Sequence, residues 1–178
     1  MPAEPAVESH ALFVLGGARS GKSAFAERRV AESGLAPVYL ATGQAFDAEM
    51  TERIGAHQAR RPASWRTVEA PLDLVATIER EAAPETALLV DCLTLWVTNL
   101  MLAGRDVDAE GDRLGECLGA RRGGLIVLVS NEVGLSVVPE NAMARRFRDH
   151  AGRLHQIVAA ACDEAIFIAA GLPLQLKG

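Results

Sequence analysis

The segment at residues 16–23, G-G-A-R-S-G-K-S, constrains the fold more than any other part of the sequence. It follows an apolar run at 11–15 that is typical of a buried strand, and a helix-like segment at 24–32 comes after it. Glycines let the backbone turn tightly there, so that several N–H groups point at phosphate oxygens near the helix N-terminus. In this spacing a lysine reaches the β- and γ-phosphates and the next hydroxyl binds Mg²⁺. The sequence therefore predicts a phosphate-binding loop formed by Gly16, Gly17, Ala18, Arg19, Ser20, Gly21, Lys22 and Ser23.

The use of lysine supports this prediction. Of the 18 basic residues, all but Lys22 and Lys177 are arginines. A phosphate-binding loop needs a compact ammonium group after its last glycine, and a planar guanidinium does not replace it. The chain therefore has a lysine at the position where such a loop requires one.

Length and composition describe an ordinary globular protein. The 178 residues suffice for one domain at 11–178, after a lead-in at 1–10 that we expect to be disordered. A net charge of −5 offers no positive field to nucleic acid or to an anionic membrane surface. No apolar run approaches the roughly 18 residues of a membrane span, and the cysteines are too widely spaced for a disulfide framework or a zinc site. We therefore expect a cytoplasmic protein without a membrane span or a nucleic-acid partner.

Strand and helix signals alternate along the chain, which predicts an α/β fold with a mostly parallel central sheet. We expect a loop at 104–111, and the sequence contains no internal repeat. The predicted strands are 11–15, 37–42, 65–68, 87–91, 124–130, 165–169 and 172–177, and the predicted helices are 24–32, 47–61, 72–82, 93–103, 112–122 and 140–162.

Asp91 ends the predicted strand at 87–91, directly after four apolar residues. In a parallel sheet the carboxyl ends of the core strands meet at one edge, so its carboxylate should lie near the phosphate-binding loop. There it can hold Mg²⁺, directly or through water, together with Ser23. The alternative is that Asp91 caps the helix that starts at Cys92 or Leu93, and the two roles are compatible.

His57 lies on the predicted helix 47–61 with three arginines three or four residues away, Arg53, Arg60 and Arg61. All four share one side of that helix. The guanidinium groups disfavour protonation of the imidazole and can hold phosphates beside it. A neutral imidazole that attacks the α-phosphorus of a nucleoside triphosphate expels pyrophosphate and leaves a nucleotidyl-histidine. The alternative is a solvated helix whose histidine has no function, because arginine-rich exposed helices are common.

Together these stretches resemble the bifunctional adenosylcobinamide kinase / adenosylcobinamide-phosphate guanylyltransferase family of cobalamin biosynthesis. The resemblance covers nearly the whole chain after the lead-in, and its histidine motif and N-E-V-G stretch are its most specific parts. The matching stretches are G-G-A-R-S-G-K-S at 16–23, Y-L-A-T-G-Q at 39–44, R-I-x-x-H-x-x-x-R-P at 53–62, W-R-T-V-E at 65–69, D-C-L-T-L-W-V-T-N-L at 91–100, S-N-E-V-G-L-S-V-V-P-E at 130–140 and R-x-F-R-D-x-x-G-R-L-x-Q at 145–156.

The resemblance implies a three-layer, RecA-like P-loop NTPase fold and two activities at one nucleotide site. ATP or GTP would phosphorylate adenosylcobinamide; GTP would then guanylylate His57, and the GMP would pass to adenosylcobinamide phosphate. It also implies a homo-oligomer. Besides the phosphate-binding loop, the implied nucleotide contacts are Thr42, Gly43, Gln44, Gln58, Ala59, Arg60, Arg61, Glu69 and Asp91.

Some positions stay open at this stage. His155 stands where the family pattern has asparagine. Glu132 and the group Arg145, Arg148 and Asp149 fit either the ligand edge of the sheet or an ordinary turn and polar helix face. An apolar set, Trp96, Leu100 and Met101, fits a bed for a corrinoid or, more commonly for apolar residues at helical spacing, the core or a subunit interface.

Two other classes of protein compete with this reading. One is a conventional small-metabolite kinase with no covalent step, in which His57 is inert. The other is a nucleotide-binding module that turns nothing over. The N-K-x-D run that reads guanine in Ras-like GTPases is not present. The sequence therefore does not predict whether the protein prefers ATP or GTP.

Overall fold

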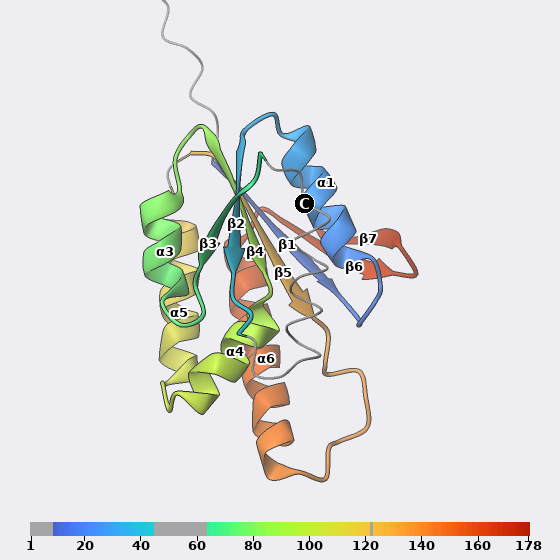
Figure 1. Ribbon diagram of the computed structural model, residues 1–178. Coiled ribbons are helices and arrows are strands. Elements are labelled where there is room, and N and C mark those ends of the chain that lie inside the picture. The colour runs from blue at the N-terminus through green and yellow to red at the C-terminus, as the bar shows by residue number, and fades with distance from the viewer. Residues whose placement is uncertain (1–8, 45–63, 122) are drawn as a thin grey trace, which may run out of the picture.

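The computed structural model describes residues 9–44, 64–121 and 123–178 (Figure 1). Within these ranges seven strands form one sheet in the order β3-β2-β4-β5-β1-β6-β7. All neighbouring strands are parallel except β7, which is antiparallel to β6. The strands are β1 (His10–Gly16), β2 (Ala36–Ala41), β3 (Arg66–Glu69), β4 (Thr86–Asp91), β5 (Leu125–Asn131), β6 (Glu164–Ala169) and β7 (Leu172–Lys177).

Helices cover both faces of the sheet, so that the fold has three layers (Figure 1). One face is packed by α1 and the other by α3, α4, α5 and α6. The mostly parallel α/β fold predicted from the alternation of strands and helices is confirmed. The described helices are α1 (Lys22–Glu32), α3 (Leu74–Glu81), α4 (Leu93–Leu102), α5 (Val107–Gly119) and α6 (Ala142–Ala161).

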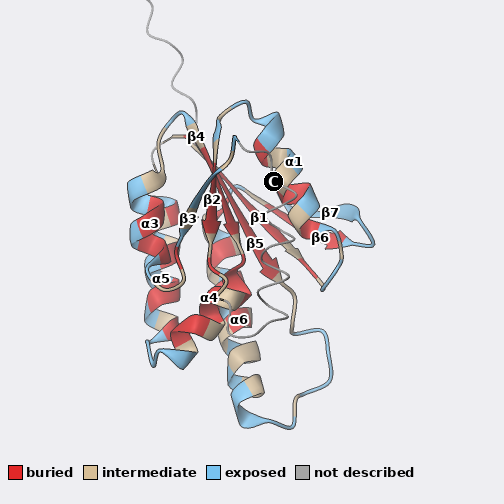
Figure 2. Ribbon diagram, in the orientation of Figure 1, coloured by how far each residue is buried: buried red, intermediate tan, exposed pale blue. Residues whose placement is uncertain are grey.

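The central strands are buried on both sides, as the red arrows of Figure 2 show. In β1, Ala11 and Phe13 pack into the core beneath α3 to α6, whereas Leu12 and Val14 pack into the core beneath α1. Parallel strands covered on both faces have apolar residues at successive positions rather than at alternate ones. For this reason β1, β4 and β5 could be predicted from short apolar runs in the sequence.

The predicted loop at 104–111 is wrong in its second half, because α5 begins at Val107. Asp106 occupies the N-cap, where its side chain accepts a hydrogen bond from the backbone N–H of Ala109. Asp108 and Glu110 follow in the first turn, where acidic side chains are favourable. The glycine at 111 lies inside the helix because its lack of a Cβ lets Leu154 of α6 approach closely.

The other described elements lie within two residues of their predicted bounds. The predicted helix 47–61 and most of the lead-in lie outside the described residues. No helix in the described ranges is long and apolar enough to cross a membrane.

Replacing Asp106 by alanine should remove the cap of α5 and lower the free energy of unfolding by about 1 kcal/mol. For a chain of this length we expect a fall of about 2–4 °C in Tm. Thermal unfolding followed by circular dichroism measures it. Asp106→Asn should keep the wild-type Tm, because asparagine caps equally well, and equal losses in both variants would contradict the capping role.

Candidate functional site

The parallel register brings the predicted site residues to one edge of the sheet. Gly16, at the end of β1, pairs with Asn131 at the end of β5. On the other side of β5, Asp91 ends β4, and Ala41 of β2 pairs with both Asp91 and Glu69. The phosphate-binding loop, Asp91 and Glu69 therefore all lie at the carboxyl edge, where open α/β sheets bind ligands.

Two glycines of the phosphate-binding loop are required by its geometry. A Cβ on Gly16 would lie 2.6 Å from the carbonyl oxygen of Ile168, and Gly21 has a φ of +99°. Lys22 is the first residue of α1, and its side chain is only 8% exposed. Its Nζ donates a hydrogen bond to the Gly17 carbonyl at 3.1 Å, so the ammonium group is held against the loop.

Segments far away in the sequence hold this loop. The backbone N–H of Glu132, just after β5, donates to the Gly16 carbonyl at 2.9 Å. On the other side, the turn between β6 and β7 donates from the N–H of Gly171 to the Ser20 carbonyl at 2.8 Å. Both residues of that turn, Ala170 and Gly171, have positive φ. The loop is thus fixed by backbone hydrogen bonds on two sides.

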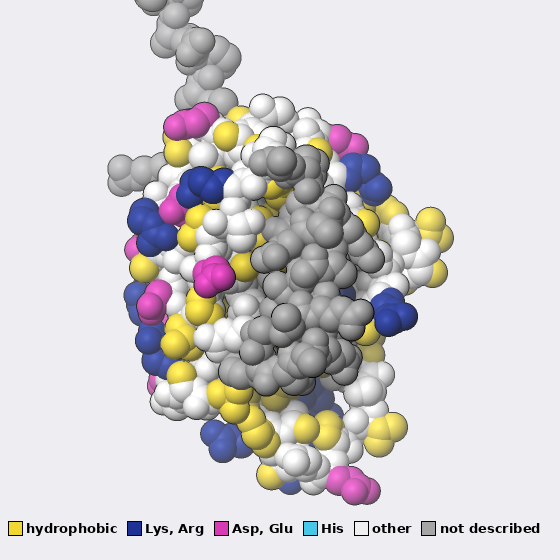
Figure 3. All heavy atoms as spheres, viewed as in Figure 1, with side chains coloured by type: hydrophobic (Ala, Val, Ile, Leu, Met, Phe, Trp, Pro, Cys, Tyr) yellow, Lys and Arg dark blue, Asp and Glu magenta, His cyan; other side chains and the backbone are white. Residues whose placement is uncertain are grey.

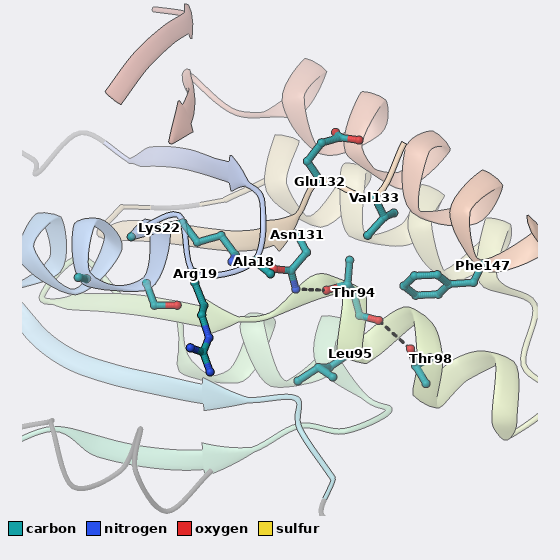
Figure 4. Close-up of a pocket in the computed structure, with 13 residues that line it drawn as sticks. Ala18, Arg19, Lys22, Thr94, Leu95, Thr98, Asn131, Glu132, Val133 and Phe147 are labelled. Carbon is teal, nitrogen blue, oxygen red and sulfur yellow. Dashed lines mark hydrogen bonds between the residues drawn. The ribbon is translucent and has the colours of Figure 1, made fainter. Parts of the chain in front are cut away.

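A cavity of about 830 Å³ opens beside the phosphate-binding loop (Figure 4). Its walls come from four elements: the loop and start of α1, the first turns of α4, the end of β5, and Phe147 of α6. Figure 4 shows Asn131 turned toward α4, where its Nδ2 donates to Thr94 Oγ1 at 2.9 Å. The lining residues are Ala18, Arg19, Gly21, Lys22, Ser23, Ala24, Thr94, Leu95, Thr98, Asn131, Glu132, Val133 and Phe147.

Thr94, Thr98 and Asn131 line the cavity but were not predicted as site residues, although all three lie in the family-like stretches. Their positions in the sequence could have indicated a role in the site. Asn131 ends a core strand, and Thr94 lies in the first turn of the helix that follows Asp91. Short polar side chains at these two places can contact a ligand at the carboxyl edge. Thr98 lies one turn further along α4, where its hydroxyl donates to the Thr94 carbonyl at 3.0 Å.

Asp91 lies one residue before the N-cap of α4, which is Cys92. The alternative role of Asp91 as the cap itself is therefore wrong. Ser23 and Asp91 offer a hydroxyl and a carboxylate, the hard oxygen ligands that Mg²⁺ prefers. The described residues contain no group of three or more acidic, histidine or cysteine side chains arranged to hold a metal ion, and a metal that is bound mainly through phosphates and water needs none.

Thr42 is fully buried, and its hydroxyl donates to the Cys92 carbonyl at 2.8 Å. Its own carbonyl accepts a hydrogen bond from Asn99 of α4 at 2.7 Å. These bonds fasten the end of β2 to α4. Gly43 and Gln44 follow at the same edge and are half-buried. Glu69 is exposed, two strands away from Asp91 across β2.

The remaining predicted contacts, His57, Gln58, Ala59, Arg60 and Arg61, lie outside the described residues. Their contact with the nucleotide stays a prediction.

The structure separates the open candidates. Trp96 and Leu100 are fully buried in the core, and the indole Nε1 of Trp96 donates to the Leu72 carbonyl at 2.9 Å. The core reading of these two residues is therefore correct. Glu132 lines the cavity, whereas Arg145 donates to two carbonyls of the preceding turn and Arg148 pairs with Asp149 at 3.5 Å.

His155 is buried behind this edge. Its Nε2 lies 2.7 Å from Ser130 Oγ, and its ring is 5.6 Å from that of Phe13. Burial lowers the pKa of His155 to about 4, although the nearby Glu132 carboxylate raises it. The imidazole is therefore neutral at pH 7. Its hydrogen bond to Ser130 holds the end of β5 in place, directly before Asn131 and Glu132.

The family model and the related proteins that match this chain point to the same family. The model of the family "Cobinamide kinase / cobinamide phosphate guanyltransferase" matches residues 12–176. The chain is 57% identical to the "Bifunctional adenosylcobalamin biosynthesis protein CobP" of Pseudomonas aeruginosa, over 93% of this chain and 96% of that protein. It is 41% identical to the CobU protein of the same description from Salmonella typhimurium, over 93% of this chain and 99% of that protein.

Among solved structures, the RadB recombinase is similar in fold. The match has a TM-score of 0.51 at 13% identity and covers 89% of this chain and 73% of that one. This likeness confirms the RecA-like fold expected from the sequence.

Lowering the pH should destabilise the protein through His155. In the unfolded chain the imidazole takes up a proton near its ordinary pKa of 6.5, whereas in the folded protein it does so only at about 4. Stability is therefore complete above pH 6.5 and is lost as the pH falls from 6.5 toward 4. Between pH 7.5 and 5 this loss is about 2 kcal/mol.

Urea unfolding at the two pH values measures this loss. His155→Asn keeps a polar partner for Ser130 and cannot titrate, so its loss over the same interval should be smaller by that amount. Equal losses in the wild type and the variant would show that His155 is not the titrating group.

Proposed function

Because the chain belongs to the cobinamide kinase / cobinamide phosphate guanyltransferase family, we propose that it phosphorylates adenosylcobinamide and then converts the product to adenosylcobinamide-GDP. The observation that carries this proposal is the cavity beside the phosphate-binding loop, with Lys22 and Ser23 in its wall and Asp91 at the same edge of the sheet. A cytoplasmic homo-oligomer stays the expectation from the sequence.

In the kinase step, ATP or GTP binds with its phosphates on the loop. Backbone N–H groups and Lys22 hold the β- and γ-phosphates. The hydroxyl oxygen of the aminopropanol arm attacks the γ-phosphorus, the bond to the bridging oxygen breaks, and the hydroxyl loses its proton. Ser23 and Asp91 would hold Mg²⁺, which neutralises charge on the phosphates when bound.

In the guanylyltransferase step, the imidazole of His57 attacks the α-phosphorus of GTP. The bond to the β-phosphate oxygen breaks, pyrophosphate leaves, and a GMP-histidine remains. A phosphate oxygen of adenosylcobinamide phosphate then attacks the same phosphorus and releases the imidazole. The resemblance at 53–62 supports this assignment, and Arg53, Arg60 and Arg61 would hold the phosphates beside the ring.

GTP labelled at the α-phosphorus tests the covalent step. The wild type should form a labelled protein adduct that is labile in acid and stable in base, as phosphoramidates are. In His57→Ala the adduct and guanylyl transfer should vanish while kinase activity persists. In Lys22→Ala both activities should fall by about 10²-fold or more, because the phosphates lose their main cation.

Other outcomes identify the competing functions. Transfer of a γ-label to adenosylcobinamide without any adduct would indicate a conventional kinase. Nucleotide binding with neither adduct nor transfer would indicate a binding module. A His57→Ala variant that still guanylylates adenosylcobinamide phosphate would contradict the proposed mechanism.

Arg19 is a further candidate for a catalytic role in this site. It lies in the phosphate-binding loop with a φ of 56°, in the left-handed region that favours glycine. Its side chain is exposed, lines the cavity, and has no partner within the described parts of the chain. In Figure 4 it extends away from Glu132 and toward the side lined by Leu95. A non-glycine residue in a strained conformation beside a phosphate site indicates a use for its side chain, such as pairing with the terminal phosphate.

Replacing Arg19 by glycine should leave stability unchanged or slightly higher, because glycine adopts this φ without strain. The rate of phosphoryl transfer should fall by about 10²-fold or more, since the transition state loses a charge-assisted contact. Thermal unfolding and initial rates at saturating nucleotide measure the two effects. Arg153→Gln removes the same charge from an exposed ion pair with Asp108 and should alter neither, whereas normal rates in Arg19→Gly would contradict the role.

A further inference from the structure

A group of exposed apolar side chains adjoins the cavity. Glu132 and Val133 line the cavity where β5 ends, and the chain then runs through a loop to the start of α6. Figure 1 shows this loop projecting beyond the carboxyl ends of the strands. Four residues, which we call the apolar strip, expose large fractions of their surface: Leu135 84%, Val137 90%, Val138 58% and Met143 50%.

Hydrogen bonds fix the chain where the loop meets α6, directly after Val138. Arg145 Nη1 donates to the carbonyls of Pro139 at 2.9 Å and Glu140 at 2.6 Å. Asn141 caps α6, and its Oδ1 accepts from the backbone N–H groups of Met143 and Ala144. The end of the strip at Met143 is therefore anchored to the start of α6. Figure 3, in the same view as Figure 1, shows hydrophobic side chains at the lower end of the molecule, where this loop and the start of α6 lie.

We propose that the apolar strip binds the corrin ring of adenosylcobinamide and of its phosphate. This inference rests on the proposed function. The reacting hydroxyl lies at the end of an arm on a large macrocycle, and a nucleoside triphosphate on the phosphate-binding loop occupies much of the cavity of about 830 Å³. The ring must then rest on the surface beside the cavity, and the strip begins at Leu135, two residues after Val133 in the cavity wall.

The chemistry of the strip fits this ligand. A corrin ring has apolar faces and a rim of amide groups. The strip offers branched apolar side chains for a face, and the exposed Ser136 and Glu140 lie among them to bond the amides. Contiguous exposed apolar surface of this kind marks ligand or protein contacts. The strip also follows β5, the strand next to β1, and the phosphate-binding loop begins at the end of β1, so an arm from a ring bound there would approach the loop.

Other apolar surfaces fit less well. Trp96 and Leu100, which the sequence offered as a corrinoid bed, are fully buried. A second exposed apolar group lies on β7, the edge strand of the sheet, and none of its members lines the cavity. These residues are Leu172, Leu174 and Leu176, which are 71%, 60% and 58% exposed.

The double variant Leu135→Ser/Val137→Ser tests the inference, and Leu174→Ser/Leu176→Ser on β7 is its matched control. Equilibrium dialysis with adenosylcobinamide, followed by its visible absorbance, should give a Kd at least tenfold higher for the strip variant and an unchanged Kd for the control. Formation of the GMP adduct from GTP alone should be the same in all three proteins. An acylated 1-aminopropan-2-ol, which lacks the ring, should be phosphorylated at equal rates by all three.

Each remaining outcome is decisive. An unchanged Kd in the strip variant, or no binding by the wild type, would overturn the inference. A weaker Kd accompanied by a smaller mass in light scattering would also overturn it, because the strip would then be a contact between copies of the chain. A wild type that binds adenosylcobinamide but does not phosphorylate it would contradict the proposed function and leave the corrin site standing.

Discussion

The parallel pairing of β1, β5 and β4 is the constraint on which the rest of the molecule depends. Because the three strands run in the same direction, Gly16, Asn131 and Asp91 end at one edge of the sheet although they are distant in the sequence. Packing on both faces fixes this register, since a slip by one residue would exchange the side chains that fit the two different cores. The register of these strands thus sets the separation between the phosphate-binding loop and the acidic group.

The same edge fixes the conformation of the loop. Gly16 approaches Ile168 of β6 so closely that no side chain fits, and Gly171 and Glu132 bond the loop from both sides. The N–H groups that point at a phosphate must be oriented before it binds, because ordering them during binding would cost affinity. The turn between β6 and β7 is therefore part of the site, although it contributes no side chain to the cavity.

The parts of the protein that could be predicted from the sequence are those determined by residues close together in the chain. Apolar runs gave the buried strands, and the spacing of glycines and lysine gave the phosphate-binding loop. The start of α5 was missed because its cap, Asp106, stands between two glycine-marked positions that suggested a loop. The burial of Thr42 and His155 was also not predictable, because each depends on a partner across the fold, Cys92 and Ser130 respectively. Tertiary hydrogen bonds of this kind leave no periodicity in the sequence.

A single bound triphosphate can serve two reactions if its two acceptors approach from different sides. The apolar strip follows β5, next to β1, so a corrinoid bound there would present its arm from the side of the phosphate-binding loop. The segment with His57 follows Gln44, which lies at the carboxyl edge on the other side of β4. In the predicted helix 47–61, His57 would lie about 15 Å along the axis from Asp47, a reach that the proposed attack on the α-phosphate can use. The two attacks would thus differ in direction as well as in the phosphorus attacked, so that neither acceptor blocks the other.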